Sequence, residues 1–190
     1  MNERSKAAIA VVGSINMDFV VETERFPVPG QTLSGRSIAY YPGGKGANQA
    51  VAAARLGASV RMVGALGSDA FGGRLRGLLE AEGIDTAGVK TTEGASGIAA
   101  ITVSGGENTI IVVAGANGEL RPEDVERNRA AVEASDIVLL QLEIPLETVE
   151  AALRLARSLG KKTILNPAPA RSFPDEWLKL ADVVTPNETE

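Results

Sequence analysis

The chain has 190 residues, is 44% hydrophobic, and carries a formal net charge of −5 with no cysteine and no histidine. This length and composition allow a buried core in one domain. The scattered charges of both signs argue against a nucleic-acid-binding protein, which would show a basic patch. Disulfides, thiolate or imidazole metal sites, cysteine nucleophiles and histidine-based triads are excluded. Acid–base chemistry is left to Asp, Glu and Lys, and metal chemistry to oxygen-ligated ions such as Mg²⁺.

The first half of the chain predicts alternating strands and helices. In order, we expect a buried strand over 8–13, extended chain over 18–22, an edge hairpin within 26–42, and then a helix over 47–56, a strand over 60–66 and a helix over 70–82. Ser68 or Asp69 is placed to cap the last of these helices.

The apolar run 7–12 is too short for a signal peptide or a membrane span, so we expect a cytoplasmic protein without a membrane partner.

The second half predicts a hairpin followed by further alternation. In order, we expect paired strands over 98–103 and 109–113, a helix beginning at Pro122, a strand over 137–141, a helix over 146–159, and strands over 162–165 and 182–185. Together these elements predict a single α/β domain over 1–190, with a mostly parallel sheet flanked by helices. Segments 31–41 and 97–113 do not fit the alternation. We expect them to pair with each other as a small β-sheet lid.

A glycine-rich turn leads into the helix predicted over 47–56, in the run Tyr41-Pro-Gly-Gly-Lys-Gly-Ala-Asn-Gln-Ala50. Glycine allows close approach of the backbone to a ligand, and the helix start offers N–H groups without partners. Lys45 adds a cation, and Asn48 adds a side chain that can donate and accept. Such a corner suits a small polyhydroxylated or anionic ligand, although a plain strand-to-helix turn with a solvent-facing lysine is the alternative. The run lacks the P-loop and dinucleotide-binding patterns.

These residues resemble the first signature of the ribokinase-like (PfkB) carbohydrate kinases. The match covers 43–50 without interruption and continues at Gly57 and Gly67. Further segments similar to this family follow one another in order: 13–18, 97–99, 114–117, 141–145, 166–170 and 185–190. The resemblance therefore covers essentially the whole chain. It implies a ribokinase-like fold, with a Rossmann-like sheet and a β-sheet lid.

The resemblance also implies an activity. It implies phosphoryl transfer from ATP to the 5-hydroxyl of a pentose, D-ribose in the first place, with Mg²⁺ and with the lid closing over the sugar. Since the edge strands of a lid have unpaired backbone groups, we expect the lid to mediate a homodimer. A fructokinase or nucleoside kinase of the same family is an alternative, and so is a non-catalytic sugar-binding or dimerising module.

Carried over by position, the resemblance assigns residues to three ligands. The sugar would be bound by Asn16, Asp18, Gly44, Lys45, Gly46, Asn48 and Glu143. Asn187 would contact the nucleotide, and Asn187 with Glu190 would form the family's Asn-x-x-Glu pattern near Mg²⁺ and the phosphates. Three of these residues also have a structural interpretation: Asp18 as a turn cap, Glu143 as a solvated loop acid and Asn187 as an Asx-turn residue.

The sequence departs from the family pattern at one point. The family's catalytic base is an Asp in a Gly-Ala-Gly-Asp motif downstream of the Asn-x-x-Glu pattern, and no Gly-x-Gly-Asp occurs in these 190 residues. The family's adenine pocket and its site for a monovalent cation, K⁺, also lie downstream. We therefore expect the C-terminal part of the fold to be missing and the chain alone to be inactive.

Overall fold

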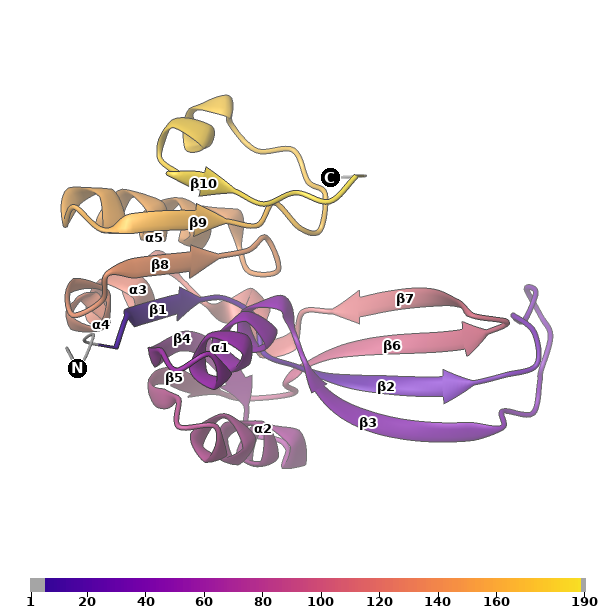
Figure 1. The fold of residues 1–190 in the computed structure, drawn as a ribbon. Helices are drawn as coiled ribbons and strands as arrows, with labels where there is room; N and C mark the ends of the chain where they lie inside the picture. The colour runs from indigo at the N-terminus through magenta and orange to yellow at the C-terminus, as the bar shows by residue number, and fades with distance from the viewer. Residues whose placement is uncertain (1–5, 189–190) are drawn as a thin grey trace.

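A computed structural model describes residues 6–188 of the chain, and its strands form two sheets (Figure 1). The larger sheet has six strands in the order β10-β9-β8-β1-β4-β5, and each neighbouring pair is parallel. Its strands are β1 (Ala8–Val12), β4 (Ser59–Gly67), β5 (Asp85–Thr92), β8 (Ile137–Leu140), β9 (Lys162–Leu165) and β10 (Val183–Val184).

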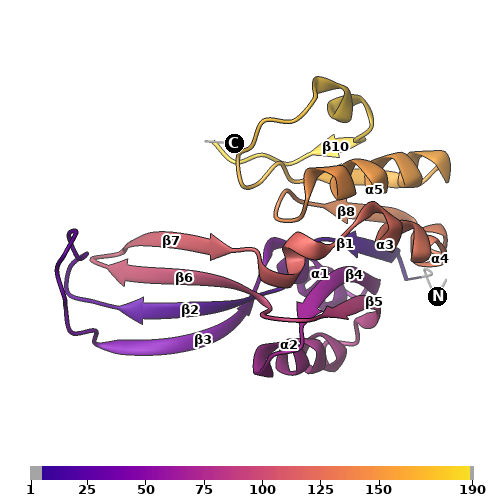
Figure 2. The same ribbon diagram turned by 180° about the vertical axis from the view of Figure 1, so that it is seen from behind.

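Helices cover both faces of this sheet (Figures 1 and 2). Because side chains alternate along a strand, Val12 of β1 packs into one buried cluster with Leu153, whereas Val11 packs into the other with Leu75. The helices are α1 (Lys45–Arg55), α2 (Ala70–Ala81), α3 (Pro122–Arg127), α4 (Arg129–Glu133) and α5 (Leu146–Ser158), with 3₁₀ turns η1 (Gly115–Glu119) and η2 (Asp175–Lys179). Within residues 6–188, none of the helices combines the length and the hydrophobicity that a membrane span requires.

The second sheet has four strands and extends away from the larger one (Figures 1 and 2). Its order is β3-β2-β6-β7, in which the central pair β2 and β6 is parallel and both outer pairs are antiparallel. Its strands are β2 (Asn16–Glu22), β3 (Ser37–Gly43), β6 (Gly97–Ser104) and β7 (Glu107–Val113). This architecture confirms the predicted fold class, a mostly parallel sheet flanked by helices with a small second sheet.

Two local predictions rest on turn and cap chemistry and agree with the structure. The turn between β6 and β7 contains Gly105 and Gly106, both with positive φ, as a tight hairpin requires. Asp69 caps α2, since its side chain accepts a hydrogen bond from the Gly72 N–H at 2.9 Å.

Three expectations about the elements need correction. Segments 31–41 and 97–113 do not pair with each other, because β2 lies between β3 and β6 in the second sheet. Strand β5 was not expected, because its sequence, DTAGVKTT, has one large apolar residue and no clear hydrophobic period. Among residues 6–188, β4 is its one strand neighbour. Helix α1 begins at Lys45, two residues before the predicted start, directly after Gly44.

Candidate functional site

The residues predicted to bind a sugar come from three chain segments that the fold brings together. Asn16 and Asp18 lie on β2, which follows β1 directly. Gly44 and Lys45 lie where β3 ends and α1 begins, and β3 pairs with β2 so that Gly43 is opposite Asn16. Glu143 follows β8, the strand next to β1. Ligands bind at the carboxyl ends of strands in open parallel sheets, so this is the expected place for a site.

Glu143 and Ser14 together hold the start of α1. The Oε2 atom of Glu143 accepts hydrogen bonds from the Ser14 hydroxyl at 2.5 Å and from the Lys45 N–H at 2.9 Å. The Ser14 Oγ accepts from the Gly46 N–H at 3.2 Å, and the Ser14 carbonyl accepts from the Ala47 N–H at 2.9 Å. The expectation that the helix start offers N–H groups without partners is therefore wrong for these three residues. The protein itself supplies their acceptors.

The glycines at this corner are required by the protein's own backbone. Gly44 has φ 89°, a conformation that other residues rarely adopt, and a Cβ there would lie 2.8 Å from the Asn16 nitrogen. A Cβ on Gly46 would lie 2.6 Å from the Ser14 nitrogen. Helix α1 thus crosses the β1–β2 connection so closely that no side chain fits between them. This crossing places Lys45 beside Glu143.

Asp18 supplies a half-buried carboxylate at the centre of the site. Its carboxylate occupies the space where Gly43 lacks a side chain, and within residues 6–188 its Oδ1 atom is buried without a hydrogen-bond partner. Burial, and secondarily the negative charge of Glu143, raise the pKa of Asp18 above its ordinary value. An acceptor in this state is suited to a ligand that brings hydroxyl donors.

Asn16 is almost completely buried, at 2% exposure, and its Oδ1 accepts a hydrogen bond from Asn117 at 2.7 Å. Asn117 and Ser14 both contact the predicted site residues, yet neither was assigned a role from the sequence. The available signal was weak, since both lie inside segments that match the family without being predicted contacts. Each has a partner more than 100 residues away along the chain, Glu143 for Ser14 and Ile15 for Asn117.

Lys45 and Glu143 line a hollow of about 590 Å³, which lies between β7, the start of α1 and the segments that follow β8 and β9. Ile110 and Val112 of β7 form another part of its lining, together with Arg171. Arg171 donates a hydrogen bond to the Leu142 carbonyl at 3.0 Å, so the segment after β9 supports the loop that carries Glu143. The hollow therefore brings β7 of the second sheet next to Lys45 and Glu143, whereas Asn16 and Asp18 are not part of its lining.

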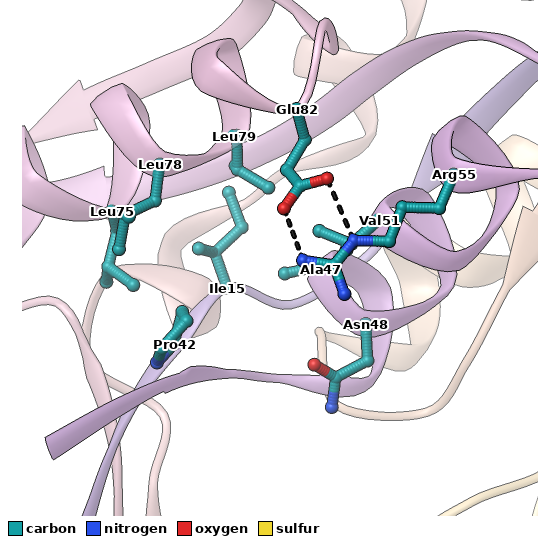
Figure 3. Close-up of a pocket in the computed structure, with 10 residues that line it drawn as sticks. All are labelled: Ile15, Pro42, Ala47, Asn48, Val51, Arg55, Leu75, Leu78, Leu79 and Glu82. Carbon is teal, nitrogen blue, oxygen red and sulfur yellow. Dashed lines mark hydrogen bonds and ion pairs between the residues drawn. The ribbon is translucent and has the colours of Figure 1, made fainter.

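Asn48 lies apart from Lys45 and Glu143. Its exposed side chain lines a different hollow, of about 330 Å³, between α1 and α2 (Figure 3). Leucines of α2 form one wall, and an ion pair between Arg55 and Glu82 lies beside them. The two hollows have no lining residue in common.

The predicted nucleotide and metal residues lie at the end of the chain. Asn187 is exposed and follows β10, at the carboxyl end of the larger sheet. Glu190 lies outside the described residues. Within residues 6–188, no three acidic side chains come close enough to hold a metal ion.

Comparison with known proteins gives consistent matches over nearly the whole chain. The sequence model described as pfkB family carbohydrate kinase matches residues 6–190. Ribokinase of Haemophilus influenzae is 45% identical over 187 residues, which cover 97% of this chain and 61% of that protein. Ribokinase of Bacillus subtilis is 45% identical over 183 residues, covering 96% of this chain and 62% of that protein. The chain thus spans about three-fifths of the length of these relatives.

A solved structure shows the same arrangement of elements. Ribokinase of Arabidopsis thaliana, in complex with ribose and ATP, superposes with a TM-score of 0.87 at 35% identity. The match covers 97% of this chain and 61% of that one. These comparisons confirm the family resemblance inferred from the sequence.

Asp18→Asn tests the electrostatics of the site. Because the pKa of folded Asp18 is raised above its ordinary value of 3.8, the folded protein binds this proton more tightly than the unfolded chain does. The contribution of Asp18 to the free energy of unfolding therefore falls as pH rises, first through the pKa of the unfolded chain and then through the higher pKa of the folded protein. We expect Asp18→Asn to melt at a higher temperature than the wild type at pH 7, and this difference to shrink below pH 3.8.

Melting curves between pH 3 and pH 8 measure this difference, because the range begins below the ordinary pKa of 3.8 and extends to neutral pH. Glu107→Gln, at an exposed position of β7, is the matched control and should show no comparable gain. An Asp18→Asn variant that melts below the wild type at pH 7 would contradict the account of Asp18.

Proposed function

Because the chain belongs to the pfkB family of carbohydrate kinases, we propose that it forms the sugar-binding part of a kinase acting on D-ribose. The reaction is transfer of the γ-phosphoryl group of ATP to the sugar's 5-hydroxyl. The observation that carries this proposal is the buried Oδ1 of Asp18, which has no hydrogen-bond partner among residues 6–188 and lies close to the Glu143 carboxylate. Support for ribose and ATP comes from the relatives, which are ribokinases, one of them complexed with both ligands.

The geometry suggests how a sugar would be held. Hydroxyl groups would donate to Asp18 and Glu143, since an ionised carboxylate only accepts. Hydrogen bonds to a charged acceptor are stronger than neutral ones, which favours ligands with several hydroxyls in fixed positions. Lys45 would add a donor, because it lines the same hollow as Glu143. Gly44 and Gly46 would contribute by letting α1 approach, rather than through side chains.

We propose that the second sheet acts as the lid of this site. Ile110 and Val112 of β7 line the hollow that contains Lys45 and Glu143. Closure of such a sheet over a bound sugar would exclude water, and this limits transfer of the phosphoryl group to water. Asn48 would join the sugar contacts only if its exposed side chain turns from the hollow between α1 and α2.

The phosphoryl-transfer machinery is proposed to lie largely outside this chain. Such a reaction needs a positioned base and groups that stabilise charge on the phosphoryl oxygens. The Gly-x-Gly-Asp pattern of the family's base does not occur in the sequence.

Asn187 is the proposed nucleotide contact. ATP, Mg²⁺ and a monovalent cation are the proposed cofactors, but the acidic residues described here do not form a metal site, so we assign no step to the metal. An ATP-dependent enzyme of this kind fits a cytoplasmic location.

Residues 1–190 alone should therefore bind ribose without phosphorylating it. A positioned base contributes about 10²–10⁴-fold to a rate, and one oxyanion donor adds about 10²–10³-fold. We expect ribose-dependent ATP turnover at least about 10²-fold below that of full-length Bacillus subtilis ribokinase assayed in parallel. Turnover close to that of the full-length relative would show that the base lies inside this chain.

Calorimetry with D-ribose, D-fructose and adenosine distinguishes the kinases of this family by the ligand they bind. Ribose should bind most tightly to the wild-type chain, and Glu143→Ala should weaken that binding. If fructose or adenosine binds more tightly than ribose, that ligand becomes the proposed substrate in place of ribose.

The second sheet is also proposed to form a homodimer. Its outer strands β3 and β7 leave unpaired backbone groups at both edges. Ile111 of β7 is 70% exposed, and its neighbours Ile110, Val112 and Val113 are each about half exposed. A row of exposed apolar side chains on an edge strand favours pairing with another copy. A non-catalytic dimerising module would use the same surface.

Sedimentation at about 50 μM protein should show a dimer, because association depends on protein concentration. Ile111→Lys should shift the protein to a monomer by placing charge in the proposed interface. Leu56→Lys is the control, since Leu56 is 89% exposed and lies directly after α1, outside the second sheet. A monomeric wild type, or an unaffected Ile111→Lys dimer, would rule out this interface.

A further inference from the structure

Asn117 makes an unusually complete set of hydrogen bonds for a residue outside the proposed ligand contacts. It lies on η1, directly after β7, and is 1% exposed. Its Oδ1 accepts from the Ile15 N–H at 2.9 Å. Its Nδ2 donates to the Ile15 carbonyl at 3.1 Å and to the Asn16 Oδ1 at 2.7 Å. One side chain thus connects the end of the second sheet to the β1–β2 connection.

The chemistry of these partners fixes which way the Asn16 amide points. The Ile15 N–H can only donate and the Ile15 carbonyl can only accept, so the oxygen and nitrogen of the Asn117 amide cannot be exchanged. The Asn117 nitrogen then needs an acceptor on Asn16, and this must be the Asn16 oxygen. The Asn16 Nδ2, with its two hydrogens, is left for other contacts.

A glycine leaves the space for this amide pair. Gly97 of β6 lies opposite Asn16 in the second sheet. A Cβ on Gly97 would overlap both the Asn117 Nδ2 and the Asn16 Oδ1. Its φ is not positive, so the backbone does not demand glycine at this position. The requirement for glycine comes chiefly from the Asn16–Asn117 pair, because the third neighbour of such a Cβ, the Ala114 carbonyl, is farther away at 3.0 Å.

We propose that Asn117 is a positioning residue that makes Asn16 a hydrogen-bond donor to the sugar. This inference rests on the proposed function and deepens it. Asp18 and Glu143 are acceptors when ionised, so they can bind hydroxyl groups but repel an oxygen that has no hydrogen. The ring oxygen of a cyclic sugar is such an atom. Asn16, oriented by Asn117, supplies the N–H that this oxygen requires.

A double-mutant cycle on ribose affinity tests whether Asn117 acts through Asn16. Asn117→Ala should weaken ribose binding about tenfold, as expected for one lost, well-placed hydrogen bond. In an Asn16→Ala background, the same change should have an effect below about twofold. Equal weakening in both backgrounds would overturn the proposal, because Asn117 would then act independently of Asn16. Asn108→Ala, at an exposed position of β7, is the matched control and should leave affinity unchanged.

Gly97→Ala provides a second route that keeps both amides. It should weaken ribose binding to a similar extent as Asn117→Ala by displacing the Asn16–Asn117 pair. Gly77→Ala is its control, since a Cβ at Gly77 meets no other atom within 4 Å. Normal ribose affinity in a folded Gly97→Ala variant would contradict the proposal.

Proton exchange in the ligand-free wild type tests the geometry without any variant. Both Nδ2 protons of Asn117 should exchange slowly with water, since both are buried donors. Fast exchange of both protons would overturn the proposal even if every variant fails to fold. A wild-type chain that binds no ribose would count against the proposed function, whereas the exchange measurement decides the amide geometry by itself.

Discussion

The arrangement of this protein depends on how the first N–H groups of α1 are satisfied. A helix start leaves such groups without partners inside the helix, and here Glu143 and Ser14 accept from Lys45, Gly46 and Ala47. The carboxylate also lies at the positive end of the helix dipole, where negative charge is stabilised. One small set of hydrogen bonds therefore joins the end of β1, the start of α1 and the loop after β8. The proposed sugar contacts lie on the last two of these segments and on β2, which follows the first.

This constraint assigns different roles to residues that look alike in the sequence. Glu143 is already bonded to the protein, whereas the buried Oδ1 of Asp18 has no partner within residues 6–188. Asp18 is therefore the proposed acceptor for a ligand, and Glu143 is proposed to combine ligand binding with holding the helix. The glycines of the corner serve the same contact, because a Cβ on Gly46 would meet Ser14. Stability and sugar binding are thus expected to be linked at this corner.

Local patterns in the sequence were sufficient for most elements. The Gly105–Gly106 turn indicated the β6–β7 hairpin, and Asp69 indicated the start of α2. Strand pairing was not predictable in the same way, because β2 and β6 pair in parallel although about 80 residues separate Asn16 from Gly97. The site residues divide in the same way, into those that local sequence indicates and those that only the fold reveals. The contiguous run around Lys45 was found, whereas Ser14 and Asn117 act through partners that only the folded chain brings near.

The central claim is that Ser14 and Glu143 act together in holding α1. Urea unfolding of the wild type, Ser14→Ala, Glu143→Gln and the double variant measures their coupling most directly. Partners in one hydrogen-bond network show interaction energies of about 0.5–3 kcal/mol. We expect a coupling of at least about 1 kcal/mol, because the Ser14 hydroxyl donates to the carboxylate at 2.5 Å. Effects that add to within about 0.3 kcal/mol would contradict the account, since the two side chains would then stabilise the fold independently.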